Sequence, residues 1–333
     1  MIDKIPDLFD KKFAIGFFLP SLLFSLLSTG IFRAYDLQSK APSKIKVISI
    51  NVFDWFQNSG TEALINASLL ILIAWIGGII LVAINRELIR FAEGYGSFNP
   101  FNLLHCLEKR RFDRIDKKVE DLDNEMTECE EKGEVFSLDS KKKLRIKSLL
   151  LVERFPSKEF LLPTSFGNIM RAFETYPMSM YGVDAIVAWE RLLSVIPKDY
   201  RDFIDDAKSH INFWLNLWYL LIVWFFEYWI LAFHYGFSLL SWPWHLIIAL
   251  ILFTLFLWFT FSRASSSAQR YGKFVKSAFD LYLPDLQRIL GFISPDSDEE
   301  ARKQWQQFNQ AILYARPDLL PQRRYYRQSD EKS

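Results

Sequence analysis

Four long apolar stretches constrain this chain more than any other feature of its sequence. They cover residues 13–31, 63–84, 211–233 and 242–261, and each is close to the roughly 20 residues that a helix needs to cross a bilayer. A backbone inside lipid must satisfy its own hydrogen bonds, so we expect these stretches to be helical. The sequence therefore predicts an all-α membrane protein with four transmembrane helices.

The first apolar stretch differs in composition from a secretory signal. Asp3, Asp7 and Asp10 precede it, and Pro20 lies in its middle, whereas a signal has a basic start and a shorter apolar core. We therefore expect a retained transmembrane helix here.

The distribution of lysine and arginine predicts the orientation of the four helices. These residues are frequent before the first stretch, between the second and third, and after the fourth, whereas the loop 34–62 has few and the turn 236–241 has none. Cytoplasmic loops carry the excess of Lys and Arg. We therefore expect a multipass protein of the plasma (inner) membrane, with its N-terminus, residues 85–208 and its C-terminus in the cytoplasm.

This topology divides the chain into four segments. Residues 1–84 form an N-terminal amphipathic segment and helices 1 and 2, with the external loop between them, and residues 85–208 form a helical cytoplasmic domain inserted before helix 3. Residues 209–262 form a transmembrane hairpin, and residues 263–333 form a helical C-terminal extension with a polar tail. The one plausible strand, 45–53, lies in the external loop.

A heptad-like seam marks the inserted domain. Its apolar residues recur at intervals of three and four, which is typical of a coiled coil or a helical hairpin; they are Phe112, Ile115, Val119, Leu122, Met126 and Cys129. Gly133 is a natural stop, after which residues 144–152 are expected to fold back antiparallel. The lysine run 141–143 is interpreted as a solvated face, with contact to anionic lipid headgroups as the alternative.

The stretch "LPTSFGNIMR" predicts a capped helix start. The free N–H groups of a helix start can bind an anion, and the residues for such a site would be Thr164, Ser165, Asn168 and Arg171. The simpler interpretation, which we favour, is that Thr164 or Ser165 caps the helix.

An acidic residue, Glu227, lies inside the third apolar stretch. A charge near the bilayer centre costs roughly 2.5–3.5 kcal/mol, so we expect this side chain to face the helix bundle. Hydroxyl and amide residues at similar depth predict an intramembrane polar cluster of Glu227 with Asn66, Ser68, Ser25 and Ser28. Either Glu227 is protonated and joins helices by hydrogen bonds, or it lines an ion path or ligand pocket. The sequence leaves both open.

Several function classes have no support in the residues. The net charge of +1 gives no general attraction to nucleic acid, so no nucleic-acid partner is expected. Cys106 and Cys129 are expected to be reduced thiols, and the four histidines are scattered, so we predict no metal. The sequence lacks a phosphate loop or a catalytic triad pattern. We therefore predict neither an enzyme nor a cofactor.

The segments "FFLPSLLF", "LPTSFGN", "YGVDAIVAWERL" and "YGKFVKSAFDLY" together resemble an uncharacterised family of bacterial multipass membrane proteins. The resemblance implies a bacterial source and this architecture, and it implies no activity.

Two functions follow as hypotheses. The first is a homo-oligomeric, channel-like or membrane-effector protein regulated through its cytoplasmic helical domain. The alternative is a membrane-anchored scaffold or adaptor that recruits a cytosolic protein partner through residues 85–208. In both, the lipid bilayer is a partner of the chain.

Overall fold

The computed structural model describes residues 10–38, 61–234 and 243–322, and every regular element among them is a helix. The predicted strand 45–53 lies outside the described residues. The chain divides into two compact units, which we call unit 1 (1–90 and 206–267) and unit 2 (91–205 and 268–333). The segments predicted separately as 85–208 and 263–333 thus fall largely within a single unit.

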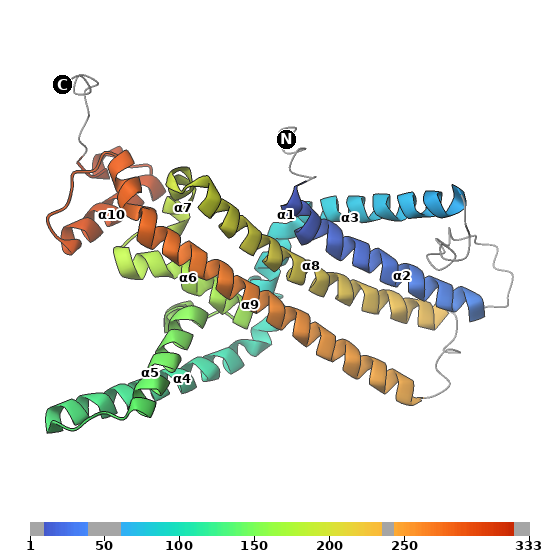
Figure 1. Ribbon diagram of the computed structural model, residues 1–333, viewed down its shortest axis with the longest axis horizontal. Coiled ribbons are helices and arrows are strands. Elements are labelled where there is room, and N and C mark those ends of the chain that lie inside the picture. Colours follow the sequence, from blue (N-terminus) through green and yellow to red (C-terminus); the bar gives the residue numbers. More distant parts are fainter. Residues whose placement is uncertain (1–9, 39–60, 235–242, 323–333) are drawn as a thin grey trace, which may run out of the picture. The chain divides into compact units, whose positions relative to one another are not determined.

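Four of the helices in the described residues are long and apolar enough to cross a membrane. This confirms the prediction of an all-helical chain with four membrane-capable helices. The first is continuous through α1 (Lys11–Phe13), a π-helical turn η3 (Ala14–Phe18) and α2 (Leu19–Gln38). The others are α3 (Thr61–Glu93), α8 (Lys198–His234) and α9 (Pro243–Ile289) (Figure 1).

Helices α3, α8 and α9 are longer than their apolar stretches. α3 continues until Gly94, whose φ is 97°, and α9 stops just before the turn at Gly291, whose φ is 75°. α8 begins directly after Pro197. α3 and α9 thus end at glycines, and α8 starts after a proline. The change from apolar to polar side chains along each helix does not end it. Pro284 lies inside α9, although proline in a helix interior usually kinks or ends the helix.

Small residues allow close packing within unit 1. Ala74 is fully buried, and a Cβ on Gly77 would overlap the Ser21 hydroxyl oxygen. A Cβ on Gly78 would lie 3.0 Å from the Phe13 ring. Small residues serve this purpose in membrane helix pairs, because lipid offers no hydrophobic drive for association.

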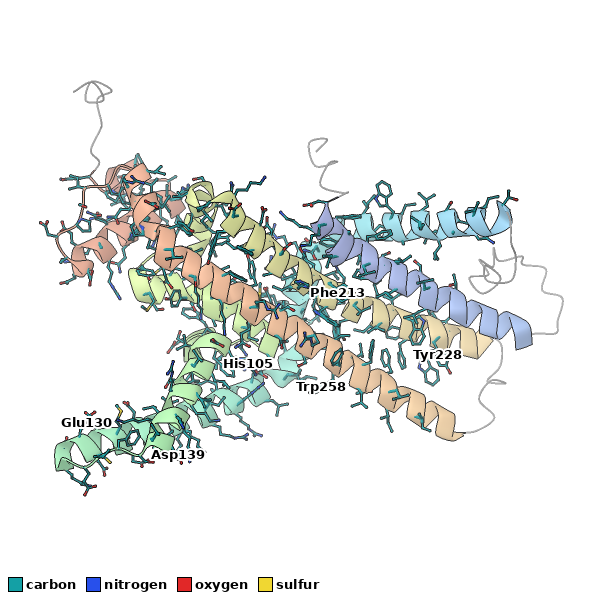
Figure 2. The ribbon with its side chains drawn as sticks, viewed as in Figure 1. His105, Glu130, Asp139, Phe213, Tyr228 and Trp258 are labelled. Carbon is teal, nitrogen blue, oxygen red and sulfur yellow. The ribbon has the colours of Figure 1, made fainter. Side chains whose placement is uncertain are left out.

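The outward faces of these helices are apolar. Exposed aliphatic residues extend along α3 and α9, and Trp258 is among the exposed aromatic residues (Figure 2). Such continuous exposed apolar surface is unusual for a soluble protein and is expected for one that faces lipid.

Unit 2 contains a helical hairpin and a separate hydrophobic core. The hairpin consists of α4 (His105–Lys132) and α5 (Leu138–Arg154), and the core packs α6 (Ser165–Tyr181), α7 (Ala185–Val195) and α10 (Asp298–Leu313) with part of α9. Short 3₁₀ turns lie at η5 (Pro100–Leu104), η6 (Lys158–Phe160) and η8 (Pro317–Leu319). The largest fully buried side chains of this core include Phe279, Phe308 and Leu192.

The predicted seam lies on the inner side of α4. Phe112 is buried, and the other five members, Ile115, Val119, Leu122, Met126 and Cys129, are half-buried between exposed neighbours. Gly133 ends α4 with φ 67°, and α4 packs against α5. The Phe112 and Phe155 rings meet edge to face with centroids 5.6 Å apart. Of the two predicted arrangements, the structure contains the helical hairpin.

Candidate functional site

Glu227 is hydrogen-bonded within unit 1. Its carboxylate oxygen Oε2 accepts a hydrogen bond from the Ser28 hydroxyl at 2.6 Å, and Ser28 is buried. This bond joins α8 to α2. Ser25 is also buried, but its hydroxyl donates to the carbonyl of Ser21 in its own helix.

The other two members of the predicted cluster lie apart from this pair. Ser68 is exposed and donates to the Leu64 carbonyl at 2.8 Å, and Asn66 is half-buried. Among the described residues, no hydrogen bond joins either of them to Glu227. Hydroxyls often bond to the carbonyl four residues earlier in a helix, which leaves them without a need for partners on other helices. The contact shown for Glu227 is therefore the one with Ser28.

A second polar group in unit 1 was missed from the sequence. Asn216 is fully buried and donates to the Gly16 carbonyl at 2.8 Å, and Asn85 donates to Asn212 at 3.4 Å. Asn212, Asn216 and Glu227 are separated by four and eleven residues, which places them on one face of α8. This spacing is the signal in the sequence that could have identified the polar face, although Asn212 and Asn216 lie near the start of the apolar stretch.

The start of α6 is closed by the chain itself. The Thr164 hydroxyl accepts from the Gly167 N–H at 2.9 Å and donates to the Ala92 carbonyl at 2.8 Å. A Cβ on Gly167 would lie 2.9 Å from Glu93 backbone atoms and closer still to the Glu93 carbonyl oxygen. Ser165 is the first residue of the helix and is half-buried. The geometry thus matches the capping interpretation.

Asn168 and Arg171 bond to protein groups near this helix start. Asn168 is fully buried, accepts from the Leu162 N–H at 2.7 Å, and donates to the Leu162 carbonyl and to Glu108. Arg171 pairs with Glu174 at 3.4 Å. An anion at this helix start would have to displace these contacts.

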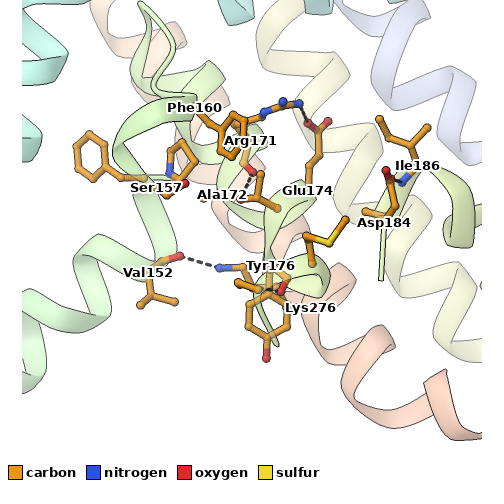
Figure 3. Close-up of a pocket in the computed structure, with 16 residues that line it drawn as sticks. Val152, Ser157, Phe160, Arg171, Ala172, Glu174, Tyr176, Asp184, Ile186 and Lys276 are labelled. Carbon is orange, nitrogen blue, oxygen red and sulfur yellow. Dashed lines mark hydrogen bonds and ion pairs between the residues drawn. The ribbon is translucent and has the colours of Figure 1, made fainter. Parts of the chain in front are cut away.

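Unit 2 contains a cavity of about 450 Å³ that sequence reasoning did not predict. Side chains from α5, α6, α7, α9 and the segment before η6 line it (Figure 3). Aliphatic and aromatic residues form most of its wall, among them Val152, Phe155, Phe160 and Ile186. The charged residues Arg171, Glu174 and Lys276 interrupt this apolar wall. No short sequence motif could reveal it, since the lining residues come from positions more than a hundred apart.

The charged groups of this cavity are held by specific contacts. The Arg171 guanidinium lies 5.4 Å from the Phe160 ring centroid, besides its pair with Glu174. Burial raises the pKa of Glu174, and the neighbouring Arg171 opposes part of that rise. The Lys276 ammonium donates to the Val152 carbonyl at 2.7 Å and lies 5.2 Å from the Tyr176 ring centroid. These contacts hold two cationic side chains against an apolar wall.

A tyrosine pair lies beside the cavity. The hydroxyls of Tyr176 and Tyr181 both donate to the same Asp280 oxygen, at 2.9 and 2.7 Å. Burial and the bond to the Asp280 carboxylate raise the pKa of both tyrosines. Both phenols are therefore donors at neutral pH and fix α6 to α9. A second cavity of about 350 Å³ shares Val152, Tyr176 and Lys276 with the first.

Metal ligation has no candidate among the residues that the structure describes, because no group of three His, Cys, Asp or Glu side chains is placed to hold an ion. Cys106 is exposed and Cys129 is half-buried, and both are free thiols.

Comparison with known proteins finds no family model, no curated protein and no solved structure that matches this chain. The resemblance to bacterial multipass proteins therefore stays a prediction, and function has to be argued from the site geometry.

Proposed function

We propose that this membrane protein is a membrane-anchored scaffold whose unit 2 recruits a cytosolic protein partner at the cavity between α5, α6 and α7. The observation that carries the proposal is the cavity itself, which offers an apolar wall and charged groups on a folded helical unit. Protein partners bind through a few apolar or aromatic anchors in such pockets, with polar groups around them.

The rim of the cavity supports this proposal. Ile186 is 75 % exposed at its edge, and Met178, Val152 and Phe160 are also exposed. Single exposed apolar residues are ordinary, but several around one hollow indicate a binding surface. Arg171 and Glu174 would orient the partner, because a charge pair beside an apolar anchor selects among partners more than it adds affinity.

Site-specific photo-crosslinking tests this function. A photoreactive phenylalanine at Ile186 in the full chain, in its native membrane, should give a discrete adduct that Met178→Asp abolishes. The matched control places the same probe at Leu281, which is exposed on α9 outside the cavity. Equal adducts at both positions, or none at Ile186, would contradict the proposal.

A homo-oligomeric channel is the second candidate, and the polar face of α8 favours it. Asn212, Asn216 and Glu227 share that face within the otherwise apolar stretch 211–233, and ionisable residues inside membranes often mark ion paths. It ranks second because Glu227 bonds to Ser28 of the same chain, which is also what a structural bond between helices requires. Ion flux through reconstituted protein should change in conductance or pH response with Glu227→Gln. Absence of flux in every oligomeric state would exclude the channel.

A further inference from the structure

Helix α5 is apolar on two opposite faces. On one face Leu144, Leu150 and Leu151 are half-buried, and the last two pack on the cluster of Phe112, Phe155 and Leu161. The opposite face exposes four aliphatic side chains: Leu138 at 68 %, Ile146 at 61 %, Leu149 at 54 % and Val152 at 55 %. With a rotation of about 100° per residue, these four lie within one third of the helix circumference.

Basic residues share this exposed face. Lys142 and Arg145 fall within the same angular range, Lys141 lies about 20° outside it, and all three are exposed. None of them forms an ion pair with an acidic residue in the described part of the chain. We call these seven residues, Leu138, Lys141, Lys142, Arg145, Ile146, Leu149 and Val152, the α5 outer face.

The acidic residues of α5 leave this face cationic. The helix has six Lys or Arg and two acidic residues. Of the acids, Glu153 is paired with Lys273 at 2.8 Å and also accepts from Gln269. Asp139 lies in the first turn (Figure 2), where a carboxylate is stabilised by the helix dipole. This surface therefore presents apolar side chains interspersed with unpaired cations.

We propose that the α5 outer face docks on the anionic surface of a lipid bilayer. Amphipathic helices with aliphatic and basic residues lie in the headgroup region, where the apolar side chains enter the acyl boundary and the cations attract anionic lipids. The chain is a membrane protein, so its own anchor keeps lipid at a high effective concentration near this helix.

Charge complementarity selects lipid over a second copy of the chain. Two α5 outer faces meeting across a two-fold axis would bring three cations against three, which like-charge repulsion disfavours. An anionic membrane surface instead attracts each cation. The α5 outer face shares Val152 with the rim of the proposed partner cavity. The probe below is at residue 146, which lies outside that cavity, and it measures lipid contact and not protein capture, so the two proposals fail separately.

The test uses the full chain reconstituted in liposomes. An environment-sensitive fluorophore is attached through Ile146→Cys in a Cys106→Ser, Cys129→Ala background, and the control label is attached through Ser194→Cys on α7. The liposomes contain phosphatidylcholine alone or an equal mixture with phosphatidylglycerol. We expect a blue shift and quenching by a lipid-borne spin label at residue 146 in the anionic liposomes, with no change at residue 194.

Charge variants measure how much the basic residues contribute to the affinity for lipid. Neutralising Lys141, Lys142 and Arg145 to Gln should weaken docking by about fivefold per residue, on the order of 100-fold together. The matched control, Arg114→Gln with Lys117→Gln and Lys118→Gln on α4, removes the same number of exposed charges and should leave docking unchanged. Equal emission in the two lipid compositions would overturn the proposal. A shift that follows the number of protein copies per liposome, regardless of lipid charge, would assign the face to a second copy and also overturn it.

Discussion

Gly167→Ala tests how closely the start of α6 packs against the last residues of α3 inside unit 2. The added Cβ would lie 2.9 Å from the Cα and carbonyl carbon of Glu93 and closer still to its carbonyl oxygen. Ordinary contact begins near 3.4 Å, and the atoms that it meets are backbone, so α6 and the end of α3 must separate.

The expected loss of stability at the start of α6 is the sum of three contributions. Overpacking a fitted contact costs typically 1–3 kcal/mol, and separation also weakens the Thr164–Ala92 hydrogen bond, worth about 1 kcal/mol. Alanine inside a helix returns roughly 0.5–1 kcal/mol relative to glycine. We therefore expect a net destabilisation of about 2 kcal/mol at the start of α6.

Hydrogen exchange followed by mass spectrometry on the full chain in detergent measures this local opening. Two kcal/mol corresponds to about 30-fold faster exchange of the amides at the start of α6. Gly30→Ala is the matched control, because a Cβ there meets nothing within 4 Å. Unchanged exchange around Gly167 in the variant would refute the argument that this glycine is required by close backbone approach.

Three further predictions follow from other contacts. Ser28→Ala should lower the thermal midpoint in detergent, because it removes the bond to Glu227, worth about 0.6–1.7 kcal/mol between membrane helices; Ser68→Ala, which removes a bond within one helix, should leave it nearly unchanged. Burial raises the pKa of Glu174, so its contribution to stability is greatest below the ordinary carboxyl pKa and is lost as pH rises through the raised value. Glu174→Gln should therefore make the melting temperature less dependent on pH across that window. A variant whose melting temperature still falls with pH as in the wild type would refute the assignment of this dependence to Glu174. Reporter tags at residue 1 and near residue 150 should both label the cytoplasmic face. Tags on opposite faces would contradict two crossings between them, and both tags on the external face would contradict the positive-inside orientation.

The four membrane-capable helices were predictable because hydropathy reads length and composition directly. Helix boundaries were less so. Hydropathy alone ends the second stretch at residue 84, whereas α3 continues to Glu93. The signal for that end in the sequence is Gly94, because a helix crosses from lipid to water without a break unless Gly or Pro ends it. The hairpin was predictable for the same kind of reason: a seam period and a stop glycine are local signals.

The partners of polar side chains were harder to predict. Depth along a helix suggested Ser25, Ser28, Asn66 and Ser68 for Glu227, but depth fixes only one coordinate, and rotation about each helix axis decides which side chains meet. Ser28 faces Glu227, whereas Ser68 bonds to its own backbone. The cavity of unit 2 depends on how five separate segments pack, so no periodicity could have revealed it.

The direction in which polar groups bond explains why function is assigned to unit 2. Thr254 and Ser68, both exposed on their helices, donate to the carbonyl four residues earlier, so they can face lipid without unpaired donors. Ser28 and Asn216, both buried, bond across helices. These two outward-facing hydroxyls are thus satisfied within their own helices. The Ser28 hydroxyl and the Asn216 amide N–H find partners on another helix of the same chain, whereas the Oδ1 atoms of Asn85 and Asn216 are buried without a hydrogen-bond partner among the described residues. A pore lined by several subunits would need outward-facing groups left for water or ions, and this pattern offers less support for a pore than the cavity of unit 2 offers for a bound partner.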